Sequence, residues 1–455
     1  MRVIIIGAGT GGLSLAHGLR RAGIDVRVFE KEPTRMHGRL GHRVGISPAG
    51  SYALQQNLPP EIFDLFVATC ARSPKYFNIV TEQLDEILSV GDISDSEIDP
   101  VNSEKSVSRM TLRQVLLTGL EDITEFGKRF ERYEENTDAT VTAFFADGSS
   151  ATGDVLVGAD GARSKLRKQR LPQARMEQTG ILSIGARVPS TPETRALVSE
   201  KILRGVTLAM APKGMGAIIH VMDFKWDANG VKPRTAVADA DIIRSWSGKK
   251  YDDSQDYMLW AIWAARRWYP EDPEKLGPEE LQRLALRMTE KWSPRFRKLI
   301  ELSELKTVNS INIRTSVPLD PWESSRVTLL GDAVHTMTPG RGVGANTALE
   351  DAALLCKRLI EVRDGRRDLI EAIHSYEGDM LEYSRHVVLE SRKQMDARGV
   401  IHKPVIGRAV LALARTAMRV ANHLPLLKRM MQKKQMELRK ISDAVAIERQ
   451  RAQMA

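Results

Sequence analysis

The amino-acid sequence predicts an α/β protein with two sheet domains and a helical C-terminal tail. A run of β-branched residues at 3–6 leads directly into glycines and a helical pattern, which is typical of a strand buried on both faces of a parallel sheet. The apolar alternation between 171 and 316 predicts a second, mostly antiparallel sheet inserted into this first domain. At 326–330 a further apolar strand and its helix return the chain to the parallel sheet.

The motif Gly7-x-Gly9-x-x-Gly12 joins the first strand to the first helix. Gly7 allows a tight turn, Gly9 lets the backbone approach a pyrophosphate, and Gly12 lets the helix pack closely on the strand. The pyrophosphate would lie at the helix N-terminus, where backbone N–H groups favour an anion. A second strand at 25–29 ends in Glu30, 18 residues after Gly12, near the usual spacing for an acid that binds ribose hydroxyls. The motif and Glu30 therefore predict a Rossmann-like dinucleotide site.

The next part of the first domain carries weaker signals. Residues 53–88 show a helical pattern with polar interruptions, and the acidic, serine-rich stretch 92–108 predicts a surface loop. A helix is expected from 108 to 117, with Arg109 and Arg113 on one face because they are four residues apart. Surface charge is the simpler explanation for this pair.

Two further polar residues lie at positions where a cofactor contact is plausible. The pattern at 141–153, with an Asp-Gly turn, predicts a hairpin, and the apolar strand 155–157 then ends in Gly-Ala-Asp160-Gly. A carboxylate at a strand end, followed by a basic helix start, suits a phosphate or ribose contact; a simple turn is the alternative. Arg43 lies in a glycine-containing loop, where solvation and a cofactor contact explain it equally well.

The hydrophobic pattern of the sequence changes after residue 170. Strand-like alternation recurs at 180–188, 206–211, 217–224 and 257–264, and six of the seven tryptophans fall between 171 and 316. Aromatic residues of this kind form either a core or a ligand wall, and a core is the simpler explanation. We therefore expect a dinucleotide-binding domain at 1–170 and 317–390, a β-rich substrate domain at 171–316, and a basic helical extension at 391–455.

The stretch from Gly331 to Asn346 is the most specific signal after the opening glycines. Asp332 follows the strand at 326–330, where a carboxylate can accept hydrogen bonds from sugar or polyol hydroxyls. Three further glycines then precede a helix N-terminus. This pattern predicts a second set of backbone N–H groups directed at an electron-rich ligand.

Composition and charge narrow the class of protein. The net charge of +9 equals that of residues 403–455 alone, which hold twelve Lys or Arg and three Asp or Glu. The rest of the chain sums to zero, so we expect no nucleic-acid partner. Two cysteines, no Cys/His cluster for a metal and no secretory signal before the first strand favour a reducing, cytoplasmic setting.

The tail contains an apolar segment at 405–427 that is interrupted by Arg408, Arg415 and Arg419. Their spacings of seven and four place these arginines on roughly one helical face. A basic amphipathic helix of this kind either makes a peripheral contact with an anionic membrane surface or packs its apolar face on the rest of the protein. Packing on the protein is the simpler explanation.

Taken together, these motifs resemble those of the single-component, FAD-dependent monooxygenases, the family that includes the aromatic hydroxylases of the para-hydroxybenzoate hydroxylase type. The resemblance covers about residues 1 to 390, with the motifs in the right order and spacing. They are Gly7-x-Gly9-x-x-Gly12 with Glu30, Arg109-x-x-Leu112-x-x-x-Leu116, Gly158-Ala-Asp-Gly161, and Gly331-Asp332…Pro339-x-x-Gly342…Ala345-Asn346.

The resemblance implies FAD as cofactor, NAD(P)H as co-substrate and a cofactor contact for each motif residue. Near the adenosine and ribityl parts these are Glu30 at the ribose, Asp332 at the ribitol hydroxyls, Arg109 at the ribityl–phosphate region, and Asp160 in a motif associated with the pyrophosphate and NAD(P)H. Near the flavin ring they are Arg43 and Gly45 beside it, and the backbone N–H groups of Gly344 and Ala345 at its pyrimidine edge. A helix N-terminus there would stabilise the negative charge of reduced flavin.

The chemistry implied by the resemblance is oxygen insertion. In this family NAD(P)H reduces a flavin that swings outward, and the flavin returns to form a C4a-hydroperoxide with O₂. We therefore expect hydroxylation of a hydrophobic, aromatic or polyketide-like small molecule by a monomer or homodimer. Epoxidation, Baeyer–Villiger oxidation and reduction stay open because they use the same fold. A halogenase is disfavoured because Trp260-Ala-Ile-Trp263 lacks the Trp-x-Trp-x-Ile-Pro spacing, and the intact glycines and acids disfavour a non-catalytic protein.

Few protein side chains are required for catalysis because the cofactor carries the chemistry. Arg187 resembles a position from which family members reach the active site from the second domain. His220, expected on the strand 217–224, could accept or relay a phenolic proton near neutral pH. A structural role is the simpler explanation for both. His335 is expected to shape the loop that follows Gly331.

Overall fold

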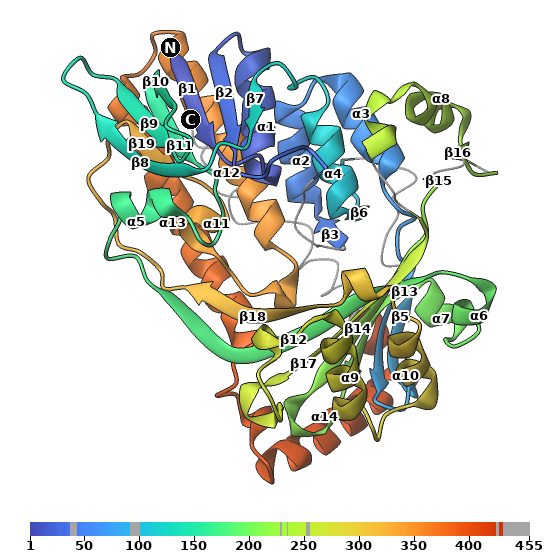
Figure 1. Ribbon diagram of the computed structural model, residues 1–455. Coiled ribbons are helices and arrows are strands. Elements are labelled where there is room, and N and C mark those ends of the chain that lie inside the picture. The colour runs from blue at the N-terminus through green and yellow to red at the C-terminus, as the bar shows by residue number, and fades with distance from the viewer. Residues whose placement is uncertain are drawn as a thin grey trace.

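A computed structural model describes residues 1–36, 43–91, 101–227, 230–233, 235–251, 255–424 and 427–430. Figure 1 shows a parallel sheet in one half of the molecule and a larger sheet in the other half. The parallel sheet has the strand order β19-β11-β1-β2-β7. Its strands are β1 (Arg2–Ile6), β2 (Asp25–Glu30), β7 (Thr124–Phe126), β11 (Val155–Gly158) and β19 (Val327–Leu329).

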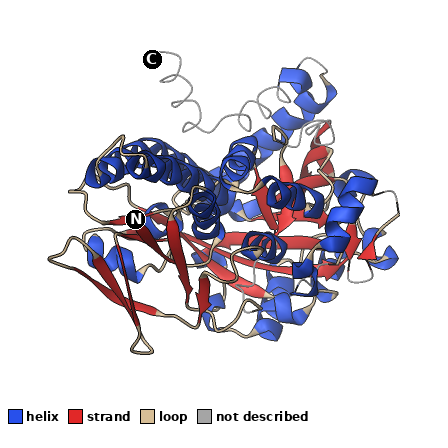
Figure 2. Ribbon diagram, turned by 90° about the horizontal axis from the view of Figure 1, so that it is seen from above, coloured by secondary structure: helices blue, strands red, loops and turns tan. Residues whose placement is uncertain are grey.

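The first strand is the centre of this sheet because its apolar side chains are covered on both faces. Val3, Ile4 and Ile5 are fully buried. The helix α12 (Gly344–Arg363) packs on both α1 (Thr10–Arg21) and α13 (Leu369–Gln394). Figure 2 shows from above that helices lie against the strands throughout the molecule. A three-stranded antiparallel sheet contacts β1 and β11 and contains the predicted hairpin; its strands are β8 (Phe130–Glu135), β9 (Val141–Phe145) and β10 (Ser150–Gly153).

A short antiparallel pair, β3 (Arg43–Ile46) with β6 (Lys105–Ser108), lies beside the parallel sheet. The expectation of a surface loop at 92–108 is wrong for β6, because its four residues pair with β3 and are all buried; residues 92–100 lie outside the described part. The helix expected at 108–117 is confirmed as α4. The neighbouring helices are α2 (Pro48–Asn57), α3 (Pro60–Thr69), α4 (Arg109–Leu117), α5 (Lys165–Arg170) and α11 (Asp332–His335).

The larger sheet has seven strands in the order β18-β12-β17-β14-β13-β4-β5. The strands expected between 180 and 264 are confirmed in β12, β13, β14 and β17. The bounds are β4 (Tyr76–Thr81), β5 (Glu86–Gly91), β12 (Met176–Pro189), β13 (Gly205–Met210), β14 (Gly216–Met222), β17 (Tyr257–Ala265) and β18 (Asn309–Ser316). The shorter elements around it are α6 (Pro192–Arg195), α7 (Glu200–Leu203), α8 (Val237–Ser245), β15 (Trp226–Asp227) and β16 (Gly230–Val231).

Two strands of the larger sheet come from the N-terminal part of the chain. The helical pattern expected through 53–88 is wrong for 76–88, where β4 pairs in parallel with β13 and antiparallel with β5. The strand is short, and its buried residues are Asn78, Val80 and Thr81 while Phe77 and Ile79 are half-buried, so its local pattern does not distinguish strand from helix. The sheet therefore joins residues 76–91 to the segment 171–316.

The two faces of the larger sheet have different neighbours. One face packs on α9 (Pro278–Met288) and α10 (Pro294–Glu301), with Trp260 against Phe296. The other face turns towards the first domain, because Met222 and Tyr257 belong to the core of that domain. At the far end of this second face, α14 (Ile406–His423) packs on β5.

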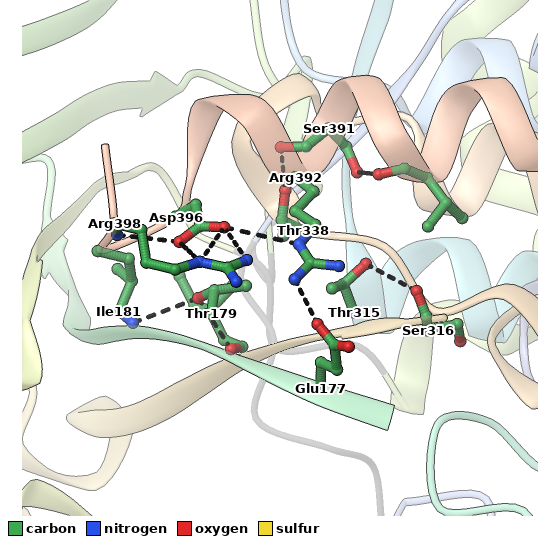
Figure 3. A network of polar contacts seen from close by, with 12 residues as sticks. Glu177, Thr179, Ile181, Thr315, Ser316, Thr338, Ser391, Arg392, Asp396 and Arg398 are labelled. Carbon is green, nitrogen blue, oxygen red and sulfur yellow. Dashed lines mark hydrogen bonds and ion pairs between the residues drawn. The ribbon is translucent and has the colours of Figure 1, made fainter. Parts of the chain in front are cut away.

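A polar network fastens the end of α13 to the larger sheet (Figure 3). Arg392 forms an ion pair with Glu177 of β12, and its Nε lies 3.6 Å from Asp396 Oδ2. Arg398 also pairs with Asp396, at 2.6 Å. Thr338 donates a hydrogen bond of 2.6 Å to the carbonyl of residue 391, which connects the same helix end to the loop after α11. The two domains are thus linked beside that loop.

Candidate functional site

Four of the residues expected to contact the cofactor lie at one edge of the parallel sheet. Asp332, Asp160, Gly7 and Glu30 stand at or directly after the carboxyl ends of the strands β19, β11, β1 and β2, which are neighbours in that order. Ligands of open α/β sheets bind outside the carboxyl ends of the strands. The fold therefore brings together residues that are separated by up to 325 positions in the sequence.

The glycine turn has the shape that a bound anion requires. Gly7 has φ of +113°, and a Cβ there would lie 2.4 Å from the Ala159 carbonyl oxygen. A Cβ on Gly12 would lie 2.2 Å from the Gly7 oxygen, so strand and helix approach closely at this point. A Cβ on Gly9, by contrast, would lie 4.0 Å from its nearest neighbour, the Ala159 carbonyl oxygen. Gly9 also precedes α1 without a side-chain cap, which leaves the first backbone N–H groups open to a phosphate.

The carboxylate of Glu30 is held against this turn. Its two oxygens accept hydrogen bonds from the backbone N–H of Ala8 at 2.8 Å and of Glu32 at 3.0 Å. The Nη2 atom of Arg113 lies 3.8 Å from Glu30. Burial lowers the pKa of Arg113, and the Glu30 charge opposes that shift. The expectation of surface charge is therefore wrong for Arg113. The available signal was its position one helical turn after Arg109, which is itself exposed.

A second residue that the motifs did not identify connects the two aspartates. Arg167 of α5 is buried and donates hydrogen bonds to the carbonyls of Ala333 at 2.8 Å and Ala162 at 3.0 Å. Burial lowers its pKa, while the charges of Asp160 and Asp332 raise it. The Oδ2 atom of Asp160 accepts from the Lys165 N–H at 2.9 Å, whereas Oδ1 is buried without a partner. Such an orphaned acceptor fits a hydroxyl or other donor of a bound ligand.

Asn346 brings β3 to the N-terminus of α12. Its Nδ2 donates to the Gly45 carbonyl at 3.0 Å, and its Oδ1 accepts from the Ser47 N–H at 2.8 Å. Gly344 and Ala345 form the first turn of the same helix. Gly45 and these two backbone N–H groups, all expected at the flavin, are thereby placed side by side. Arg43, on β3, donates to Ser106 Oγ at 2.9 Å.

A buried network supports the loop that follows β19. Asp351 of α12 is fully buried and accepts from the Gly331 N–H at 2.6 Å and from Tyr383. Its Oδ2 also lies 2.7 Å from His335 Nε2. Burial lowers the pKa of His335, but the Asp351 carboxylate outweighs it and the net pKa is raised. His335 therefore lies at the base of the loop, and Asp351 had no sequence signal because it lies within a helix.

Arg187 and His220 lie in one cross-strand row on the larger sheet. Arg187 of β12 pairs with Leu259 of β17, and Leu259 pairs with His220 of β14, so all three side chains point to the same face. That face is the one turned towards the first domain. Because neighbouring strands are about 5 Å apart, the two residues are about 10 Å from each other.

The environments of these two residues differ. Both ring nitrogens of His220 are buried without a hydrogen-bond partner. Burial lowers its pKa well below the usual value, and the positive charge of Arg43 lowers it further. Arg187 instead pairs with Glu304 at 3.1 Å, and its guanidinium lies over the Tyr257 ring. Its Nε is buried and has no hydrogen-bond partner. The row thus combines a neutral imidazole with a fixed cation.

The fold and the edge of the parallel sheet define a dinucleotide-binding protein of the flavoprotein type. A family model described as "FAD binding domain" matches residues 117–391, and one for pyridine nucleotide-disulphide oxidoreductases matches 1–179. A solved structure from Photorhabdus luminescens, a candidate FAD-containing monooxygenase, is 31% identical with a TM-score of 0.74 and covers 87% of this chain and 98% of its own. The chain belongs to the family of single-component, FAD-dependent monooxygenases.

Curated relatives fall in the same family. A dual O-methyltransferase/FAD-dependent monooxygenase from Cercospora beticola is 33% identical over 83% of this chain. This chain spans only 44% of that relative, about half the length of the dual-function proteins it matches. An FAD-dependent urate hydroxylase from Klebsiella pneumoniae is 28% identical over 87% of this chain and 90% of the relative. Among the described residues, no helix is long and apolar enough to cross a membrane.

Proposed function

We propose that this protein is a monooxygenase that binds FAD, uses NADH or NADPH and O₂, and hydroxylates a hydrophobic, aromatic or polyketide-like small molecule. The observation that carries the proposal is the face of the larger sheet around His220. Leu208, Ile218 and Leu259 on this face are half-buried, and β14 contacts β6, the strand paired with β3, where Arg43 and Gly45 lie. A substrate placed between this face and the cofactor would be shielded from water.

FAD would lie along the edge of the parallel sheet. Its pyrophosphate fits the N-terminus of α1 at Gly9, with Glu30 at the adenosine ribose. Asp160 and Asp332, joined by Arg167, fit the middle of the cofactor, and Arg109 is assigned by resemblance to the ribityl–phosphate region. The backbone of Gly344 and Ala345 would meet the flavin ring. Bound FAD supplies the electron transfer and the oxygen activation that no side chain provides.

The apolar side chains of the proposed substrate face are half-buried, and a bound ligand would bury them fully. Five half-buried apolar residues surround His220 on its own face: Leu208, Ile218, Leu259, Ala261 and Trp263. Such a surface favours an apolar ring system over a charged metabolite. The name of one relative, an FAD-dependent urate hydroxylase, supports a cyclic substrate, because urate is a ring compound.

His220 is the residue we assign to the proton of such a substrate. A neutral imidazole accepts a hydrogen bond from a phenolic hydroxyl and so raises electron density on the ring that is attacked. Arg187, whose guanidinium pairs with Glu304, lies two strands from His220, and its Nε would donate a hydrogen bond to an oxygen of the substrate.

The buried, unpaired thiols of Cys70 and Cys356 agree with a reducing compartment such as the cytoplasm.

The test uses the purified protein with FAD. Oxidation of NADH and of NADPH is followed with a panel of phenols and fused-ring aromatics, and mass spectrometry measures label from isotopic O₂ in the product. His220→Gln should lower product formation, as kcat/KM, by about 100-fold, and its pH profile should change. His386→Gln, at an exposed histidine of α13, is the matched control and should behave as wild type.

The product distinguishes the remaining chemistries. A hydroxylated ring supports the proposal, whereas an epoxide or a ring-expanded ester would replace hydroxylation by epoxidation or Baeyer–Villiger oxidation. A reduced product without labelled oxygen would overturn the monooxygenase assignment. A protein that does not take up FAD would overturn the cofactor site as well.

A further inference from the structure

The helix α14 is apolar on two opposite sides. One side packs on the larger sheet: Leu411 and Ala421 are buried, and Met418 contacts the pair Leu88 and Val90 of β5. This contact agrees with the simpler expectation for the tail, that an apolar face of its helix packs on the protein. It leaves Ile406, Leu413 and Val420 of the same helix exposed.

The opposite side of α14 carries an exposed apolar ridge. The ridge consists of Ile406, Leu413, Val420 and Leu424, which are 54%, 71%, 52% and 46% exposed. The spacings of seven place Ile406, Leu413 and Val420 in one stripe along the helix, and Leu424 follows directly after its C-terminal end. A continuous exposed stripe of this kind marks an interaction surface, whereas singly scattered apolar residues do not.

The surroundings of the ridge are basic. Arg408 and Arg419 are exposed on one flank of it, and residues 403–430 contain six Lys or Arg and no Asp or Glu. We propose that the ridge is a membrane-docking surface that lies in the interface of an anionic bilayer. The apolar side chains would enter the headgroup boundary, and the cations would meet anionic lipid headgroups.

Charge favours a lipid surface over a second copy of this chain. Two copies that paired along the ridge would bring Arg408 and Arg419 against like charges, and no acid in 403–430 would neutralise them. An anionic bilayer neutralises every cation on the flank. Amphipathic helices with an apolar face and a basic flank bind bilayers through both contributions.

The orientation of the ridge is fixed by polar contacts on the sheet side. Arg415 hydrogen-bonds Glu82 and the Met210 carbonyl. Asn422 donates to Glu86 at 3.1 Å and accepts from the Ser89 N–H at 3.2 Å. These contacts hold one side of α14 against the sheet, so the ridge on the opposite side points away from it. Figure 1 shows α14 at the outer end of the second domain. Docking therefore requires no folding step.

Co-sedimentation of the full-length, FAD-loaded protein with vesicles tests the proposal. Phosphatidylcholine vesicles containing about 30% phosphatidylserine should bind it, pure phosphatidylcholine should bind it far less, and high salt should weaken binding. Ile406→Ser and Leu413→Ser should each weaken binding about ten-fold, and Arg408→Gln or Arg419→Gln about five-fold. FAD content and Tm check that each variant is folded.

The matched controls are residues of equal exposure elsewhere. Ile311 of β18 is also 54% exposed, so Ile311→Ser removes the same side chain from a different surface and should bind as wild type. Arg244→Gln makes the same charge change on α8. Equal loss in control and ridge variants, or equal binding to neutral and anionic vesicles, would overturn the proposal. A dimer in light scattering that Leu413→Ser converts to a monomer, with vesicle binding unchanged, would assign the ridge to a second copy instead.

Discussion

The side-chain amide of Asn346 donates a hydrogen bond of 3.0 Å to the carbonyl of Gly45, which is 301 residues earlier in the chain. The same side chain accepts from Ser47 and so holds β3 against the first turn of α12. This contact links β3, which carries Gly45, to the helix turn that holds Gly344 and Ala345, and all three positions are expected at the flavin. Asn346 is therefore a positioning residue of the proposed cofactor site.

Asn346→Ala should weaken FAD binding about ten-fold and lower the free energy of unfolding by about 1–3 kcal/mol, because the Ser47 N–H and the carbonyls of Gly45 and Gly342 lose their partner. Fluorescence titration and chemical denaturation measure the two effects. Gly50→Ala should reproduce the loss of FAD affinity, since its Cβ would lie 2.2 Å from Asn346 Oδ1 and displace the amide. Wild-type affinity in both variants would show that the contact does not organise the site.

Gly12→Ala should abolish FAD binding and destabilise the protein by about 3 kcal/mol or more, because the added Cβ would lie 2.2 Å from a backbone oxygen. Gly378→Ala is the control within another helix, where no atom lies within 4 Å of the new Cβ. That change should raise the free energy of unfolding by about 0.5–1 kcal/mol through helix propensity. Equal effects of the two substitutions would contradict the close approach of α1 and β1.

The His335–Asp351 pair should make stability depend on pH at the alkaline side. The pKa of His335 is raised in the folded state, so its stabilisation is complete below the unfolded pKa of about 6.5 and is lost as pH rises through the folded value. The free energy of unfolding of wild type, relative to His335→Gln, should therefore fall as the pH rises above about 6.5. A difference that stays constant over this range would show that His335 does not titrate there.

His17 should produce the opposite dependence at acid pH. Burial lowers its pKa to about 4, while its Nε2 lies 2.9 Å from the Leu116 carbonyl. The unfolded chain is protonated below about pH 6.5, so wild type should lose about 3 kcal/mol between there and pH 4, relative to His17→Gln. Glutamine can still donate to Leu116, and the exposed His386→Gln serves as control. A parallel pH profile for wild type and His17→Gln would contradict this assignment.

The parallel sheet and its ligand-binding edge were readable in the sequence because their signals are local. A buried strand, a glycine turn and an acid at a strand end occupy a few consecutive residues each. The misassigned segments were 76–88 and 105–108, where short strands pair with partners far along the chain. β6 holds a single apolar residue, Val107, and β4 has only half-buried side chains at Phe77 and Ile79, so no local pattern reveals that these segments are strands.

The sequence by itself determined the α/β architecture and the family, and it singled out the backbone positions that we propose for FAD, since these follow from glycine geometry and hydrophobic periodicity. The tertiary structure alone decided which polar side chains act together. Arg113 with Glu30, Arg167 with two aspartates, and Asp351 with His335 are contacts between separate elements. Likewise only the packing of α14 revealed which of its apolar sides is covered and which is exposed. Side-chain pairing across elements depends on where strands and helices meet, and that is a property of the whole fold.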